Sequence, residues 1–123
     1  MKPPRALNCA PGCPVEVTLE VISGRWKCVI LYHLLRGPVR FGQLRRLIPG
    51  VTQRMLTLQL RELEADGLVE RTAYPQVPPR VDYRLTPLGE SLRAVVLAML
   101  AWGEANHDTV MALRGGEVGG VAS

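Results

Sequence analysis

A three-and-four spacing of leucines marks an amphipathic helix near the middle of the sequence. Leu56, Leu60 and Leu63 follow one another at steps of four and three, so they share one helix face and point toward a core. Thr52 is placed to cap the start of the helix, and Gly67 stands where a left-handed residue commonly ends one. The pattern predicts a helix of about four turns, followed by a strand.

The face of this helix opposite the leucines is basic and polar, and it carries Arg54, Thr57, Leu58 and Arg61. Arg54 lies in the first turn, where a positive charge opposes the helix macrodipole at a cost of about 0.3–1 kcal/mol. One interpretation is that these side chains face the phosphates and base edges of nucleic acid. The alternative is an amphipathic helix with scattered surface charge.

Two shorter helices are predicted before this segment, and an arm without periodic pattern precedes them. Residues 1–12 contain three prolines and a glycine, so we expect a flexible arm. Pro14 suits the first position of a helix. The apolar stripes of the two helices are Val15, Leu19 and Ile22, and then Trp26, Ile30 and Leu34.

The segment between residues 39 and 50 predicts a strand, a brief helix and a turn. Residues 39–41 are interpreted as a short extended piece, and a helix is expected over residues 42–48 with Leu44 and Leu47 facing inward. Gly50 then makes the turn into the central helix. Two helices joined by a tight glycine-containing turn, the second with a basic face, are typical of a helix-turn-helix.

Two strand-like runs after the central helix, residues 68–74 and 81–85, predict a β-hairpin. The proline-rich connection PQVPPR suits a protruding wing better than a tight turn. We expect Arg80 near the tip of the wing and Arg71 and Arg84 along its flanks, available to a phosphate backbone or a minor groove. An exposed hairpin with solvated arginines is the alternative.

The last predicted helix is apolar on nearly all sides. Thr86 and Pro87 are a strong start signal, since a capping hydroxyl precedes a proline. No polar residue occurs between Ala94 and Trp102, and one small domain cannot cover both sides of such a helix. We therefore predict a dimer interface, with a helix buried in the protomer's own core as the alternative. From Gly103 the pattern fades, so residues 108–123 are expected to hold the helix end and a mobile tail.

Length and composition fit one domain with a modest core. The chain has 123 residues, of which 47% are hydrophobic and 21% charged. Neither an apolar span of membrane length nor a signal-peptide core is evident, and three cysteines argue against a disulfide framework, so we expect a cytoplasmic protein. The net charge is +4, and no acidic residue occurs between Glu20 and Glu62. Such a one-sided stretch attracts polyanions.

Four segments, taken in order, carry a family resemblance. They are CPVE at residues 13–16, GRWKCVIL at 24–31, RFGQLRRLIPGVTQRMLTLQLRELEADGLVER at 40–71 and YPQVPPRVDYRLTPLGESL at 74–92. The chain resembles the HxlR family of bacterial winged-helix transcriptional regulators, relatives of the MarR group, over roughly residues 13–107.

The resemblance implies a mainly α fold with a small β-hairpin wing (α+β), a winged helix-turn-helix dimerised through its N- and C-terminal helices. It implies a homodimeric transcriptional regulator, with repression as the expected outcome, on a pseudo-palindromic operator in double-stranded DNA. The residues expected at the DNA are Arg40, Arg45, Arg46, Thr52, Gln53, Arg54, Thr57, Leu58, Arg61 and Arg80. Those expected at the dimer interface are Val15, Leu19, Leu88, Leu92, Val95, Met99 and Trp102.

Side-chain chemistry suggests how some of these residues read DNA. An arginine suits guanine, Gln53 suits adenine, and Thr57 or Leu58 suits a thymine methyl group. Arg45 and Arg46 are expected either at phosphates or in solvent.

The resemblance also suggests a thiol switch, because Cys13 matches a cysteine that senses oxidants, electrophiles or aldehydes in some family members. A thiol beside a helix N-terminus can have a lowered pKa. Cys9 is the candidate resolving thiol, and Cys28 is expected to be structural. An inert packing role for Cys13 and a switch by a small-molecule effector are the alternatives.

Other classes of function find little support in the sequence. It contains no phosphate-cradling loop and no nucleophile elbow, so we expect neither an enzyme nor a cofactor. Cys9 and Cys13 have no partner pair at ligand spacing, so no metal site is predicted. The main competitor is a winged helix used for protein contacts without specific DNA binding.

Overall fold

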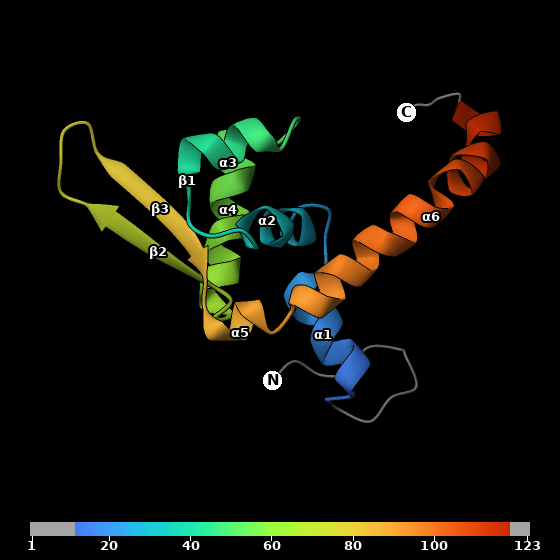
Figure 1. The fold of residues 1–123 in the computed structure, drawn as a ribbon, viewed down its shortest axis with the longest axis horizontal. Helices are drawn as coiled ribbons and strands as arrows, with labels where there is room; N and C mark the ends of the chain where they lie inside the picture. The colour runs from blue at the N-terminus through green and yellow to red at the C-terminus, as the bar shows by residue number, and fades with distance from the viewer. Residues whose placement is uncertain (1–11, 119–123) are drawn as a thin grey trace. The chain divides into compact units, whose positions relative to one another are not determined.

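The computed structural model describes the backbone of residues 12–118, and its side chains as far as residue 115 (Figure 1). The chain divides into two compact units, one ending at Leu92 and the other beginning at Arg93. The predicted arm, except for Gly12, and the last five residues lie outside the described residues. Within these, no helix is long and apolar enough to cross a membrane.

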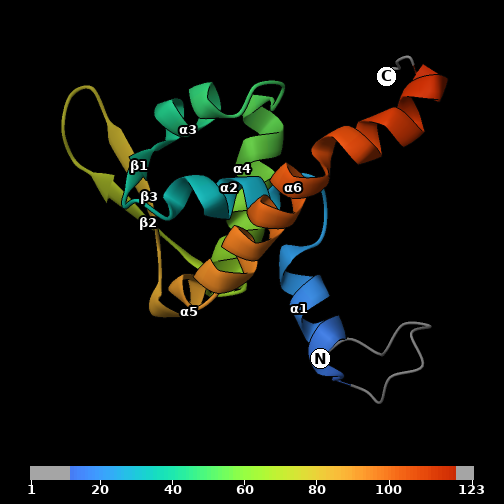
Figure 2. The same ribbon diagram turned by 45° about the vertical axis from the view of Figure 1, so that its right-hand side comes forward.

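The first unit contains short helices and a small sheet. In chain order its elements are α1 (Pro14–Ile22), α2 (Lys27–Leu34), β1 (Val39–Arg40), α3 (Phe41–Leu47), α4 (Gln53–Ala65), β2 (Val69–Tyr74), β3 (Arg80–Leu85) and α5 (Pro87–Glu90). The strands form an antiparallel sheet in the order β1-β3-β2. Figures 1 and 2 both show the β2–β3 hairpin extending away from α2, α3 and α4, as a wing does. The predicted mainly α fold with a hairpin wing is confirmed.

Helix α4 has the capping and the buried face that its sequence predicts. The Thr52 hydroxyl accepts a hydrogen bond from the Met55 amide at 3.0 Å, which satisfies a free donor of the first turn. Leu56, Leu60 and Leu63 are fully buried. At the other end, the amide of Leu68 bonds to the Leu63 carbonyl at 3.0 Å and that of Gly67 to the preceding turn, with a positive φ of 76° at Gly67. This is the Schellman ending that favours glycine.

The helical core receives its other large side chains from α2 and α3, and one of the predicted inward positions, Leu47, is wrong. Ile30, Leu34 and Leu44 are fully buried, but Leu47 is 41% exposed and Ile48 is buried instead. In so short a helix, residues three and four positions after Leu44 are both candidates for the core, and here the second is the one buried. Phe41, expected to be extended, begins α3, so β1 has only two residues.

The predicted helix from Thr86 is two helices. The Thr86 hydroxyl accepts a hydrogen bond from the Gly89 amide at 3.1 Å and so caps α5. A Cβ atom at Gly89 would lie 2.1 Å from the Leu68 carbonyl oxygen, so α5 can approach the end of α4 only with glycine there. The chain turns at Ser91 and Leu92 before the next helix begins. The hydrophobic repeat continues across this break, which is why periodicity does not reveal it.

The second unit is the single helix α6 (Arg93–Val118), with 26 residues. It continues past Gly103, where the apolar pattern fades. Several of its large apolar side chains are exposed: Leu97, Met99, Leu100, Trp102, Met111 and Leu113.

Candidate nucleic-acid interface

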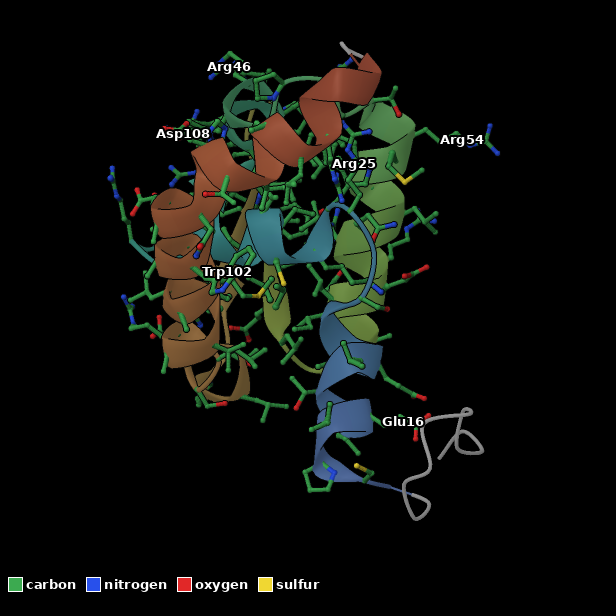
Figure 3. All side chains as sticks on the ribbon, turned by 90° about the vertical axis from the view of Figure 1, so that its right-hand side faces the viewer. Glu16, Arg25, Arg46, Arg54, Trp102 and Asp108 are labelled. Carbon is green, nitrogen blue, oxygen red and sulfur yellow. The ribbon has the colours of Figure 1, made fainter. Side chains whose placement is uncertain are left out.

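The exposed face of α4 brings together the central residues predicted to bind DNA. Its side chains line an open depression of about 880 Å³, formed by Thr52, Gln53, Arg54, Met55, Thr57, Leu58 and Arg61. Leu58 is 47% exposed, although it is apolar and lies on a helix with a complete core face. Figure 3 shows Arg54 projecting outward from α4. Polar, basic and apolar groups are therefore presented together on a rigid helix.

Two further predicted residues lie on the helix before α4. Arg45 and Arg46 are both exposed and occupy the last turn of α3, and Figure 3 shows Arg46 at the outer edge of that helix. A basic residue in the last turn of a helix is stabilised by the macrodipole, so their position has a structural explanation as well as a binding one.

A second concavity lies between α4 and the sheet. It has a volume of about 740 Å³ and is lined by Arg40, Phe41, Gly42, Gln53, Thr57, Arg61, Glu64, Arg71, Pro79, Arg80, Val81 and Tyr83. We call it the wing groove. Gln53, Thr57 and Arg61 line both the wing groove and the α4 depression, so the two surfaces are continuous.

Two wing arginines are already paired with carboxylates. Arg80 donates to Asp82 through Nε at 3.1 Å and Nη2 at 2.9 Å, and its guanidinium lies 4.8 Å from the centre of the Tyr74 ring. This pairing holds the pKa of the Asp82 carboxyl below its usual value. Arg84 binds Glu70 at 2.8 Å. Arg80 begins β3 opposite Tyr74, the last residue of β2, so it lies next to the connecting loop, near the tip of the wing as predicted.

Tyr83 and Arg71 form the wall of the wing groove on the sheet side, and the predicted site did not include Tyr83. They are directly opposed across β2 and β3. The Tyr83 side chain is buried, and its ring centre lies 6.3 Å from that of Phe41. Burial raises the pKa of Tyr83, while the Arg71 guanidinium beside the hydroxyl opposes that rise. The alternation along β3 is visible in the sequence, but its partner strand and register are not.

Lys27 does not contribute to the basic surface. It is 7% exposed, and its Nζ atom lies 2.7 Å from Glu62 Oε1 near the end of α4. Lys27 therefore adds no free positive charge to the acid-free stretch of sequence. Its ion pair with Glu62 links α2 to α4 instead.

The described cysteines differ in environment. Cys13 is half-buried at the N-cap of α1, where its carbonyl accepts from the Val17 amide at 2.9 Å. The Cys28 thiol lies 3.7 Å from the Ile22 carbonyl, and burial raises its pKa, which disfavours the reactive thiolate. Cys9 lies outside the described residues. Between residues 12 and 115, no cluster of three histidine, cysteine or acidic side chains is arranged to hold a metal ion.

The residues predicted for the dimer interface are all apolar, and most of them are exposed. Val15 is 64% exposed, Leu19 41%, Leu88 57%, Met99 49% and Trp102 62%. Leu92 and Val95 are half-buried.

Comparison with known proteins gives a consistent result. The family described as HxlR-like helix-turn-helix matches residues 21–111. The "uncharacterized HTH-type transcriptional regulator YybR" of Bacillus subtilis (strain 168) is 56% identical over 103 residues, which cover 84% of this chain and 82% of YybR.

Solved structures of a redox regulator are also similar. HypR in its reduced form superposes with a TM-score of 0.76 and 56% identity, over 80% of this chain and 98% of that one. HypR in its oxidised form superposes with a TM-score of 0.73 and 58% identity, over 76% of this chain and 97% of that one.

Proposed function

The chain belongs to the HxlR-like helix-turn-helix family and is a transcriptional regulator of helix-turn-helix type, and from this premise we propose that α4 reads specific double-stranded DNA. The observation that carries the proposal is the division of α4 into two faces. Leu56, Leu60 and Leu63 fix the helix in the core, while the opposite face is basic, polar and open. Its 13 residues span about 20 Å, a length that fits along a major groove about 12 Å wide.

The side chains of this face suit direct reading of base edges. Arg54 and Arg61 each offer a planar fork of donors to guanine, and Gln53 offers a donor and an acceptor to adenine. Thr57 and Leu58 suit the thymine methyl group. The Thr52 hydroxyl uses an acceptor lone pair in the helix cap, so its proton is free to donate to a phosphate oxygen.

Arginines outside α4 would hold the duplex backbone. Arg45 and Arg46 extend the basic surface from α3, and Arg40 extends it from the β1–α3 junction. We assign these three to phosphate contact, which positions the protein without reading sequence.

We propose that the regulator is a homodimer. The exposed apolar residues of α1, α5 and α6 are the kind of surface that a second copy covers. A two-fold dimer would place two copies of α4 in successive major grooves, about 34–36 Å apart, and would require a pseudo-palindromic operator. Repression follows if that operator overlaps a promoter, and the site of action would be the bacterial cytoplasm.

We further propose that Cys13 is the thiol through which an oxidant or electrophile acts. It caps the N-terminus of α1, where the helix dipole stabilises a thiolate, and HypR, a similar protein, is described as a redox regulator. Cys28 has the opposite environment and serves as the control. Oxidant-dependent DNA binding that persists in Cys13→Ser would transfer the switch to another group or to a small ligand.

The test is selection of bound fragments from genomic DNA, followed by fluorescence-anisotropy titration of the selected duplex and a scrambled duplex at several salt concentrations. Specific binding predicts a preference of about 10³-fold or more for the selected duplex and a steep fall in affinity with salt. Equal and feeble binding to both duplexes would overturn the proposal and favour a protein-interaction module.

A further inference from the structure

Two neighbouring residues at the start of α2 make contacts at both ends of α4. Lys27, the first residue of α2, is 7% exposed, and its Nζ atom lies 2.7 Å from Oε1 of Glu62 in the last turn of α4. The ring of Trp26 lies against Gly50, in the turn before α4, since a Cβ atom at Gly50 would be 3.9 Å from Trp26 Cη2. Figures 1 and 2 both show α2 lying across α4. The start of α2 therefore holds both the turn that leads into α4 and the end of that helix.

The ion pair between Lys27 and Glu62 joins two helix ends of opposite polarity. A positive charge in the first turn of a helix and a negative charge in the last turn both oppose the macrodipole, so each residue lies at the unfavourable end of its own helix. Their contact places each charge beside the end of the other helix, where the dipole favours it. The attraction is therefore specific to this arrangement of α2 and α4, and it weakens if either helix turns or slides.

Stability alone is a weak reason for burying Lys27. A buried ion pair gains little over apolar side chains of the same size, because both charges lose water. The leucine face of α4 already attaches the helix to the core, and hydrophobic burial is non-directional. A charged hydrogen bond of 2.7 Å is directional, so it can fix the rotation of α4 about its own axis.

This rotation decides where the exposed face of α4 points. Arg54, Leu58 and Glu62 follow one another at steps of four, so they lie along one side of the helix. Fixing Glu62 therefore fixes the direction of Arg54 and Leu58, which line the open depression of α4. Lys27 lines neither that depression nor the wing groove, and it is buried, so its effect on a ligand is indirect.

We propose that Lys27 is a positioning residue for DNA reading: through Glu62, and with Trp26 holding the preceding turn, it sets the orientation in which α4 meets the base edges. This inference rests on the proposed DNA binding and adds to it a residue that does not touch DNA. Side chains that bind bases need placement within about 0.5 Å, whereas contacts to phosphates carry no sequence information. Specificity should therefore fall more than affinity for DNA in general.

The experiment measures the ratio of affinities for the selected and scrambled duplexes in Lys27→Met. This change removes the ammonium group but keeps a side chain of similar size, and Glu62, which is 47% exposed, stays in contact with water. The urea midpoint should therefore keep its wild-type value. The affinity ratio should fall about tenfold, the effect of weakening one base contact. Affinity for the scrambled duplex and the salt slope should not change, since Lys27 contacts no phosphate.

Glu62→Ala tests the ion pair from the other side, with Asp66→Ala as its matched control. Asp66 is an exposed acid at the same end of α4, so both changes remove one negative charge there. Glu62→Ala should lower the affinity ratio about tenfold and should also lower the urea midpoint, because it leaves Lys27 buried without this partner. Asp66→Ala should keep both. The charge swap, Lys27→Glu with Glu62→Lys, restores the ion pair and should recover most of the lost ratio.

Four results would overturn the inference. Two of them are a wild-type affinity ratio in Lys27→Met, and a charge-swapped protein that folds but keeps the low ratio of the single variants. A salt slope lowered by about 0.9 in Lys27→Met would show a direct phosphate contact instead. An equal loss in Asp66→Ala would assign the effect to charge at the helix end. In all four cases the wild-type protein still prefers the selected duplex, so the proposed function stands. A wild-type protein without that preference would remove both.

Discussion

Helices α4 and α6 are both encoded by apolar residues at steps of three and four, yet they bury them very differently. The three leucines of α4 are fully buried, whereas Trp102 of α6 is 62% exposed and Leu113 is 77% exposed. Helix α4 packs its leucine face into the core of its own unit, and its opposite face stays exposed and open to a ligand. Helix α6 forms a unit by itself, with apolar surface still open. A shared period therefore shows which residues form a face, but it does not show what covers that face.

The largest effect expected from this comparison is in the core face of α4. Leu60→Ala should lower the free energy of unfolding by about 2–5 kcal/mol, because the lost methyl groups leave a cavity in a closed core. Urea denaturation followed by circular dichroism measures it. Leu58→Ala, two residues earlier on the exposed face, is the control and should change stability by no more than about 0.5 kcal/mol. Similar losses for both would contradict the division of α4 into two faces.

On α6 the corresponding substitution should act on assembly. Trp102→Ala should raise the dissociation constant of the homodimer by tenfold or more, since large aromatic residues at interface centres typically contribute about 2 kcal/mol or more. Sedimentation equilibrium measures this constant. Thr109→Ala, at an exposed polar position of the same helix, is the control. A wild-type protein that stays monomeric at micromolar concentration would refute the dimer.

Gly89 in α5 and Gly103 in α6 differ in the space around them, and so in what a substitution should do. A Cβ atom at Gly103 of α6 would meet nothing within 4 Å, so Gly103→Ala should raise the free energy of unfolding by about 0.5–1 kcal/mol. Gly89→Ala in α5 should have the opposite sign because of the Leu68 carbonyl. Thermal unfolding of the two variants checks both signs, and destabilisation by Gly103→Ala would show that this side of α6 is covered.

The smallest effect concerns the misplaced charge of α4. Arg54→Ala should stabilise the protein by about 0.3–1 kcal/mol at low salt, because it removes a positive charge from the first turn. In about 1 M salt, where the Debye length is about 3 Å, the gain should largely vanish. Thermal unfolding at the two salt concentrations measures the difference. A destabilised variant would mean that Arg54 supports the fold and is not reserved for a ligand.

Local signals explain how much of the fold was predictable. The caps of α4 at Thr52 and Gly67, and its buried leucines, depend on residues close together in sequence, and these predictions are confirmed. The prediction that Leu47 faces inward is wrong, because so short a helix leaves two candidate faces. The break after Glu90 was missed because it depends on how closely Gly89 approaches Leu68, a residue far away in sequence.

The candidate site was likewise predictable only where it depends on residues close together in sequence. The basic face of α4 follows from helical spacing alone. By contrast, the pairing of Arg80 with Asp82, the burial of Lys27 against Glu62 and the position of Tyr83 beside Arg71 all require tertiary structure. Counting arginines thus identifies a basic region, while the fold decides which of them remain free.

The most direct test of the central claim is the ratio of affinities for the selected and scrambled duplexes, measured for the wild-type protein, Arg54→Ala and Arg114→Ala. Arg114 is an exposed arginine of α6, in the other unit, and serves as the control. If α4 reads bases, Arg54→Ala should reduce the ratio by about 10-fold to 100-fold, and Arg114→Ala should leave it unchanged. Equal weakening on both duplexes in Arg54→Ala, with the ratio preserved, would contradict base reading by this face.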